Sequence, residues 1–149
     1  MTEFSQVVGI KAAPDRVLAV LLDIERWPEW TSTMTSVRRI DDGPFGVGSR
    51  ARIRQPGLLP AIWLVTEIDG ARGFEWITRS PGVQLKAGHL VEAAGAGSRA
   101  TLSLRFSGLF GPLVARFYRG LSLRYLAIEA EGLRNRCEGQ IIRPSGAAT

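Results

Sequence analysis

Apolar and polar residues alternate through the middle of the chain. Between positions 50 and 107 the pattern has a period of two and is interrupted only by short turns. Such alternation is typical of strands that bury one face. When the residues before position 50 are included, the same alternation predicts strands at residues 4–11, 35–40, 49–55, 62–69, 72–80, 83–92 and 98–107. Because the later connections are short, we expect neighbouring strands to be antiparallel.

Two short helical segments are expected between the first two strands. Pro14 suits the first turn of a helix, and Asp15 is favourably placed beside the positive end of the helix dipole. Val17, Leu18, Leu21 and Leu22 then follow with helical spacing. A second helical turn is predicted over residues 25–30, where Trp27 and Trp30 would hold the short helices against the sheet.

The last long segment, residues 112–138, is predicted to form one amphipathic helix. On a helical wheel one narrow arc collects Val114, Phe117, Tyr118, Leu121, Tyr125 and Ile128. Gly132 falls in the same arc and costs about 1 kcal/mol of helix propensity relative to alanine. We therefore expect another part of the chain to approach the helix closely at Gly132.

Together these elements predict an α+β fold in a single domain. A chain of 149 residues suits one hydrophobic core. We expect residues 1–143 to form the domain and residues 144–149, which are small and polar, to form a disordered tail. A curved seven-stranded antiparallel sheet wrapped on a long C-terminal helix can enclose a cavity.

Alternation also predicts which side chains face that cavity. The inward positions expected on the last three strands are Phe74, Trp76, Thr78, Ser80, Val83, Leu85, Ala87, His89, Val91, Ala100, Leu102, Leu104 and Phe106.

Loops at alternate positions must lie at the same end of an antiparallel sheet. Loops 56–60, 80–82 and 108–112 therefore share one end, which carries Leu58, Leu59, Leu109 and Phe110. We expect these four residues to form an apolar rim at the cavity mouth, because exposed apolar loop tips usually cover or contact something. Two alternatives remain: they fold over the C-terminal helix as part of the core, or they contact a membrane or a protein.

Charge and composition exclude several functions. The net charge of +5 comes almost entirely from arginine. Arg50, Arg52 and Arg54 alternate along one strand without interleaved aromatic residues, so we interpret them as a solvated outer face rather than a nucleic-acid site.

Metal and cofactor sites are not expected either. One histidine and one cysteine, Cys137, make a zinc site of the usual ligands unfavourable. The glycine-rich residues 43–48 connect strands instead of opening a helix, so they are not a phosphate loop. A single cysteine and an N-terminus without a signal-peptide pattern lead us to expect a cytoplasmic protein.

Short motifs along the chain resemble one known family. They are Ala13-Pro14-Asp15-Arg16-Val17, Trp27-Pro28-Glu29-Trp30, Gly48-Ser49-Arg50, Trp63-Leu64-Val65-Thr66-Glu67, Phe74-Glu75-Trp76 and Phe106-Ser107-Gly108. They resemble the START-like polyketide cyclase/dehydrase and lipid-transport (SRPBCC) family. The resemblance implies the helix-grip fold and places Trp63 and Val65 inward, so Glu67 would share their face. It carries no catalytic signature, since the family includes transporters, cyclases and hormone binders.

We therefore predict a protein that binds an apolar or aromatic small molecule, lipid- or polyketide-like, without a cofactor. The expected pocket residues are Gln55, Trp63, Val65, Trp76, Thr78, Leu85, His89, Leu104, Phe117, Leu121 and Tyr125. The alternative is a cyclase- or dehydratase-type enzyme in which His89, or one of Tyr118 and Tyr125, moves a proton. His89 is equally interpreted as a hydrogen-bonded structural residue.

Overall fold

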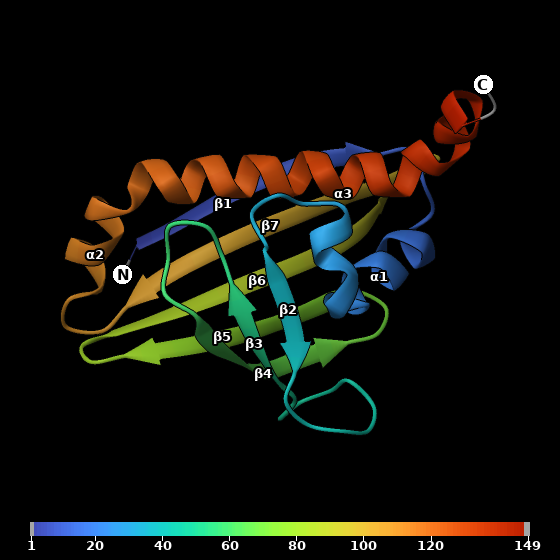
Figure 1. Ribbon diagram of the computed structural model, residues 1–149. Coiled ribbons are helices and arrows are strands. Elements are labelled where there is room, and N and C mark those ends of the chain that lie inside the picture. Colours follow the sequence, from blue (N-terminus) through green and yellow to red (C-terminus); the bar gives the residue numbers. More distant parts are fainter. Residues whose placement is uncertain (1, 148–149) are drawn as a thin grey trace.

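The computed structural model describes the backbone of residues 2–147 and the side chains of residues 2–139. Seven strands form one antiparallel sheet, and helices cover its concave face (Figure 1). In chain order the elements are β1 (Thr2–Ile10), α1 (Pro14–Leu22), the 3-10 helix η1 (Ile24–Glu29), β2 (Ser36–Arg39), β3 (Arg50–Arg54), β4 (Ala61–Asp69), β5 (Gly73–Ser80), β6 (Val83–Ala94), β7 (Gly97–Ser107), α2 (Gly111–Phe117) and α3 (Arg119–Ala147). The predicted helix-grip architecture is confirmed.

The strand order is β1-β7-β6-β5-β4-β3-β2, so the first strand pairs with the last one. All other neighbours are consecutive and antiparallel, as the short connections predict. Helix α3 lies along β1 and β7, while α1 and η1 cover the far end of the sheet (Figure 1). Helix α3 therefore contacts the β1–β7 side of the sheet, whereas α1 contacts β5 to β7.

The prediction of a single helix over residues 112–138 is wrong, because the structure has two helices, α2 and α3, which are divided at Tyr118. The backbone of Tyr118 leaves helical geometry, with φ of −98° and ψ of 14°, and α3 restarts at Arg119. Gly111 packs against the backbone of Phe106, and Ala115 is fully buried. The bend lets α2 fold onto the end of β7 while α3 continues along β1.

The division also moves the buried side of the helix. The buried positions on α3 are Ser122, Leu126, Ala130, Leu133 and Cys137. Phe117, placed inward on the straight wheel, is instead 80% exposed. A wheel assumes one straight helix, so it assigns the wrong relative direction to residues on opposite sides of a bend, which explains why Phe117 does not share the side of Leu121 and Tyr125.

Gly132 lies where another segment approaches the helix, as its position in the apolar arc predicts. A Cβ atom at Gly132 would lie 2.0 Å from the carbonyl oxygen of Trp30, far inside contact distance. The glycine thus allows α3 to pack directly on the backbone that follows η1.

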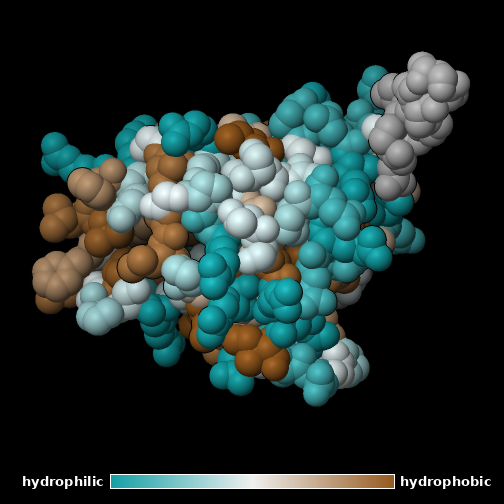
Figure 2. Space-filling model, in the orientation of Figure 1, coloured by the Kyte–Doolittle hydropathy of each residue, from teal (hydrophilic) through white to brown (hydrophobic). Residues whose placement is uncertain are grey.

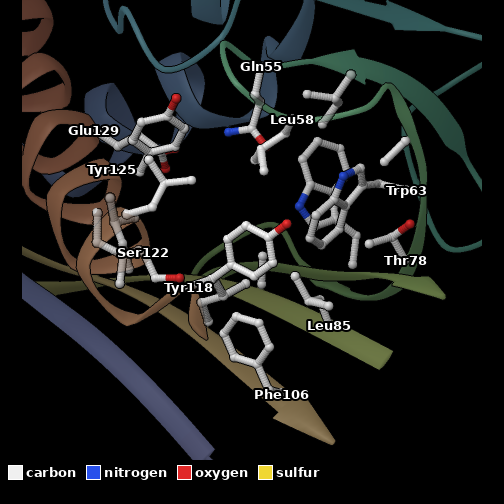
Figure 3. Close-up of a pocket in the computed structure, with 18 of the residues that line it drawn as sticks. Gln55, Leu58, Trp63, Thr78, Leu85, Phe106, Tyr118, Ser122, Tyr125 and Glu129 are labelled. Carbon is white, nitrogen blue, oxygen red and sulfur yellow. The ribbon is translucent and has the colours of Figure 1, made fainter. Parts of the chain in front are cut away.

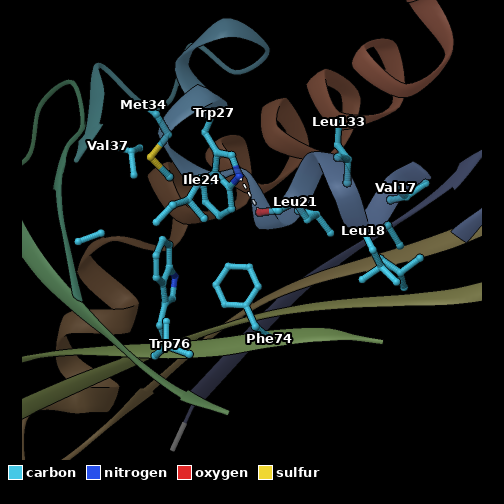
Figure 4. Close-up of a cluster of buried hydrophobic side chains, with 14 of the residues drawn as sticks. Val17, Leu18, Leu21, Ile24, Trp27, Met34, Val37, Phe74, Trp76 and Leu133 are labelled. Carbon is cyan, nitrogen blue, oxygen red and sulfur yellow. Dashed lines mark hydrogen bonds between the residues drawn. The ribbon is translucent and has the colours of Figure 1, made fainter. Parts of the chain in front are cut away.

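A cluster of buried hydrophobic side chains, which includes Trp27, Phe74 and Trp76, fills the end of the fold beneath η1 (Figure 4). Trp27 is 1% exposed, and its Nε1–H donates to the carbonyl oxygen of Leu21 at 3.0 Å. Its ring lies 5.4 Å from that of Trp76 and 6.2 Å from that of Phe74. Trp27 therefore holds η1 against the sheet, as the sequence indicates.

Strand β4 departs from strict alternation. Its register with β5 shifts between Val65 and Glu67, which marks a bulge. A bulge adds one residue to a strand and reverses the faces beyond it. Glu67, expected to point inward, is exposed, and Ile68 packs against the core instead.

Other expectations about the surface can be compared directly. Arg50, Arg52 and Arg54 are exposed, and the residues between them are buried, which confirms a solvated outer face. Within the described residues, no helix is both long enough and apolar enough to cross a bilayer. The predicted tail at 144–149 overlaps the end of α3, which runs to Ala147; residues 148–149 and the side chains beyond 139 lie outside the described part.

Candidate ligand cavity

The concave face of the sheet and the two C-terminal helices enclose a cavity of about 380 Å³ (Figure 3). Its walls come from β3 to β7, the loop after β3, η1, α2 and α3. Engineered apolar cavities of about 150 Å³ bind benzene, and ligand pockets begin near 300 Å³. The space is therefore large enough for a small organic molecule.

Most of the predicted pocket residues do line this cavity. They are Gln55, Trp63, Trp76, Thr78, Leu85, His89, Leu104, Leu121 and Tyr125, together with Leu58 and Leu59 of the predicted rim. Alternation on β5, β6 and β7 is uninterrupted across the cavity, so a period of two was sufficient to place their inward residues.

Two predicted wall residues are not in the wall. Val65 is 1% exposed, belongs to the hydrophobic core cluster that also contains Ile24 and Trp27 of η1, and does not border the cavity. Phe117 points to solvent because the chain bends at Tyr118.

The other two rim residues also lie outside the cavity. Leu109 is 84% exposed and borders no part of the cavity. Phe110 covers the β5–β6 turn: its N–H donates to the carbonyl oxygen of Gly82 at 2.8 Å, and a Cβ at Gly82 would lie 2.3 Å from its ring. At the apolar end of the molecule, Leu58 and Leu59 therefore border the cavity, whereas Leu109 and Phe110 do not.

His89 lines the cavity but is firmly held. Its Nδ1 lies 3.2 Å from the carbonyl oxygen of Phe74, and its ring stacks on Phe74 with 4.4 Å between centroids. A carbonyl only accepts, so Nδ1 carries the proton and Nε2 is left as an acceptor. Burial lowers the pKa of His89 to about 4, which keeps the imidazole neutral at neutral pH. The structural interpretation of His89 therefore accounts for its contacts.

Several lining residues were not predicted, among them Met34, Ile53 and Ser122, and the acidic one is Glu129. It lies on α3 one turn after Tyr125, and Thr33 donates a hydrogen bond from Oγ1 to its Oε2 at 2.9 Å (Figure 3). Burial raises the pKa of Glu129 to about 7, although the Thr33 hydrogen bond opposes the shift. The available signal was spacing: Tyr118, Ser122, Tyr125 and Glu129 recur at intervals of four, three and four residues on one helix face.

The loop between β3 and β4 is fastened to α3 at the edge of the cavity. The Tyr125 hydroxyl donates a hydrogen bond to the carbonyl oxygen of Pro56, and Leu58 in the same loop contributes to the wall. This contact joins two segments that are 69 positions apart.

Replacing Glu129 by glutamine is expected to change the pH dependence of stability. The unfolded carboxyl titrates near 4.5 and the folded one near 7, so the wild type loses stability as pH rises through this window. Relative to wild type, Glu129→Gln should gain at most about 3 kcal/mol in free energy of unfolding between about pH 4 and about pH 8. Urea unfolding across that range measures the difference.

The contribution of His89 to the free energy of unfolding changes with pH in the opposite direction. Its pKa is depressed on folding, so it costs stability as pH falls from about 6.5 to about 4. Both proteins retain His89, and its contribution cancels in their difference. A difference between the two proteins that stays constant with pH would contradict the raised pKa of Glu129.

Comparison with known proteins places this geometry in a family. The family model for polyketide cyclase / dehydrase and lipid transport matches residues 1–138. No curated protein sequence matches the chain.

Several solved structures share the fold at low sequence identity. The Zhui aromatase/cyclase from Streptomyces sp. R1128 has a TM-score of 0.76 at 14% identity, covering 94% of this chain and 95% of that one. The protein TTHA0849 from Thermus thermophilus has a TM-score of 0.74 at 19% identity, with 93% and 99% covered. The major latex-like protein 151 of Panax ginseng has a TM-score of 0.74 at 14% identity, with 91% and 96% covered.

The family match spans nearly the whole chain, so this protein belongs to the polyketide cyclase/dehydrase and lipid-transport family. The structural likenesses support the helix-grip fold alone, because identities below one fifth do not transfer an activity.

Proposed function

We propose that this family member binds an apolar or aromatic small molecule, lipid- or polyketide-like in shape, inside the cavity. The observation that carries the proposal is an open space of about 380 Å³ between the sheet and the helices. Trp63, Trp76 and Leu85 supply apolar walls, whereas Gln55 and Thr78 supply isolated polar groups. Such a site gains affinity by removing apolar ligand surface from water and uses its few polar groups to orient the ligand.

Two measurements test this function. Native mass spectrometry of the freshly purified protein is expected to show a species heavier than the bare chain, which identifies a retained ligand. Calorimetric titration with 2-naphthylmethanol, an uncharged aromatic probe, is expected to show saturable binding with one site per chain. A bare mass combined with no binding of this probe would overturn the proposal.

The alternative is an enzyme of the cyclase or dehydratase type, and Glu129 is the observation that favours it. General acid–base catalysis works best when the pKa of the group is close to the working pH. The pKa of Glu129 is raised to about 7, while that of His89 is lowered to about 4. Turnover of a poly-β-ketone probe should then fall in Glu129→Gln more than in His89→Ala, with binding of the probe retained. Product formation by the wild type that is no faster than without protein would leave binding as the only function.

The exposed apolar end supports contact with a membrane that contains the ligand. Leu109, Leu113 and Phe117 are exposed around α2, and Figure 2 shows apolar side chains gathered at that end of the molecule. Residues 108–128 include Arg116, Arg119 and Arg124 but no acidic residue. Apolar side chains beside unopposed positive charge are suited to a bilayer that contains anionic lipid.

Vesicle flotation tests this contact. At low salt we expect the protein to float with vesicles that contain phosphatidylserine, and to float less with pure phosphatidylcholine. Leu113→Ser together with Phe117→Ser should abolish flotation because they remove the inserted apolar surface. Val47→Ser, an exposed apolar residue in the loop before β3, is the matched control. Wild-type protein that stays unbound to both vesicle types would contradict membrane contact.

A further inference from the structure

The cavity offers no positive charge to a buried ligand. Among the described residues that line it, none is a lysine or an arginine. Its ionisable side chains are Glu129, His89 and two tyrosines, and burial keeps His89 neutral at neutral pH. A carboxylate brought into this space would lose its hydration without gaining a cationic partner, which is strongly unfavourable. Fatty acids and other anionic ligands therefore do not fit the cavity.

Glu129 is held by a hydrogen-bond chain that runs toward its carboxyl group. The Thr33 N–H donates to Thr31 Oγ1, and the two hydroxyl oxygens lie 2.9 Å apart. Thr33 has one hydroxyl proton, and it is directed to Glu129 Oε2. Thr31 must then donate its own proton to Thr33. Both threonines are at most 2% exposed, so the chain is a fixed part of the fold.

The direction of donation in this hydrogen-bond chain favours negative charge on Glu129. Hydrogen bonds donated to a carboxylate stabilise its ionised form, whereas burial in an apolar cavity opposes it. In the empty cavity burial dominates and raises the pKa of Glu129 to about 7. A cation placed in the cavity would reverse this balance, because it supplies the countercharge that the walls lack.

The rest of the wall is suited to a ligand whose body is aromatic or apolar and whose head is cationic. Trp63, Trp76, Tyr118 and Tyr125 border the same space, and aromatic rings both pack apolar groups and attract cations to their faces. Figure 3 shows Tyr125 and Glu129 together on one side of the cavity and Trp63 on the other. The cavity therefore has a polar, acidic side and an apolar, aromatic side.

We propose that the ligands of this cavity are apolar or aromatic amines, whose ammonium group pairs with the Glu129 carboxylate while the body packs against Trp63, Trp76 and Leu85. This inference rests on the proposed ligand-binding function and names its ligand class. No covalent step is involved. When the ammonium form binds at neutral pH, the fraction of Glu129 that is protonated in the empty cavity releases its proton to the buffer.

Three probes with one skeleton test the inference: 2-naphthylmethylamine, 2-naphthylmethanol and 2-naphthoate. In calorimetric titrations slightly above neutral pH, we expect the amine to bind at least about tenfold more tightly than the alcohol. The carboxylate should bind at least about tenfold more weakly than the alcohol. Amine titrations in two buffers with different ionisation enthalpies should also show proton release near pH 7, whereas alcohol titrations should show none.

Glu129→Gln keeps the size of the side chain and removes its charge. We expect it to lose the preference for the amine over the alcohol. Glu131→Gln, on the exposed side of the same helix, makes the same change in net charge and should behave as wild type. A cooperative thermal unfolding transition shows that the Glu129→Gln variant is folded.

The outcomes separate this inference from the function on which it rests. If the alcohol binds and the amine does not bind more tightly, or if Glu129→Gln keeps the preference, the amine inference is wrong and the cavity function stands. Binding of the carboxylate as tightly as the alcohol would also overturn it. If none of the three probes binds, the proposed function fails and the inference fails with it.

Discussion

Replacement of Ala87 by tryptophan is expected to abolish uptake of 2-naphthylmethanol. Ala87 lies on β6 between Trp76 of β5 and Leu104 of β7, and all three residues line the cavity. An indole group at this position would project from the middle of the sheet into the space that the ligand occupies. We expect calorimetry to show no binding heat with Ala87→Trp, and a graded loss of affinity with the smaller Ala87→Leu.

A matched control separates filling of the cavity from general damage. Ala93 lies on the same strand but is exposed beyond the cavity, so Ala93→Trp adds the same side chain elsewhere. It should bind the probe as wild type does. Thermal unfolding of all three variants reports whether each is folded. Unchanged affinity in a folded Ala87→Trp protein would show that the ligand binds somewhere other than this cavity.

Of the substitutions proposed for this protein, Trp27→Ala is expected to cause the largest decrease in the free energy of unfolding. The side chain is 1% exposed, contacts the rings of Trp76 and Phe74, and donates its N–H to Leu21. Removal of a buried tryptophan side chain typically costs about 3–5 kcal/mol, because transferred apolar surface and packing contacts are both lost. Urea unfolding of Trp27→Ala near neutral pH measures the change.

Trp27→Phe is the control for that experiment. It keeps an aromatic ring in the cluster and removes the N–H that bonds to Leu21. We expect a smaller loss than for alanine, since part of the buried surface is retained. A loss below about 1 kcal/mol for Trp27→Ala would mean that η1 is not held by this side chain.

Much of the sheet could be predicted from the sequence because a strand has a rigid period of two. Trp76, Leu85 and Leu104 face the cavity as alternation requires, and their strands pair in uninterrupted register. The same rule failed at Glu67, since a bulge inserts one residue after Val65 and moves the next inward position to Ile68. The helical wheel failed for Phe117 because it assumes a straight helix, and the chain bends at Tyr118.

The candidate site was predictable only in part. Gln55, Trp63 and Tyr125 were placed correctly, while Glu129 was missed. Thr33 and Glu129 are 96 positions apart, and no local pattern relates a threonine after η1 to a carboxylate on α3. The charge state of Glu129 depends on how much water the assembled fold excludes from it, which is a property of the surrounding elements.

The sequence by itself determined the order of strands and helices, the inward face of β5 to β7 and the family, because these follow from short-range periodicity and local motifs. Only the tertiary structure decided that the interior contains a cavity, that Val65 lies in the core and not in the cavity wall, and that Glu129 is buried beside Thr33. The physical reason is that periodicity gives the direction of a side chain relative to its own backbone. Whether that direction leads to another side chain, to solvent or to empty space depends on segments far away in the chain.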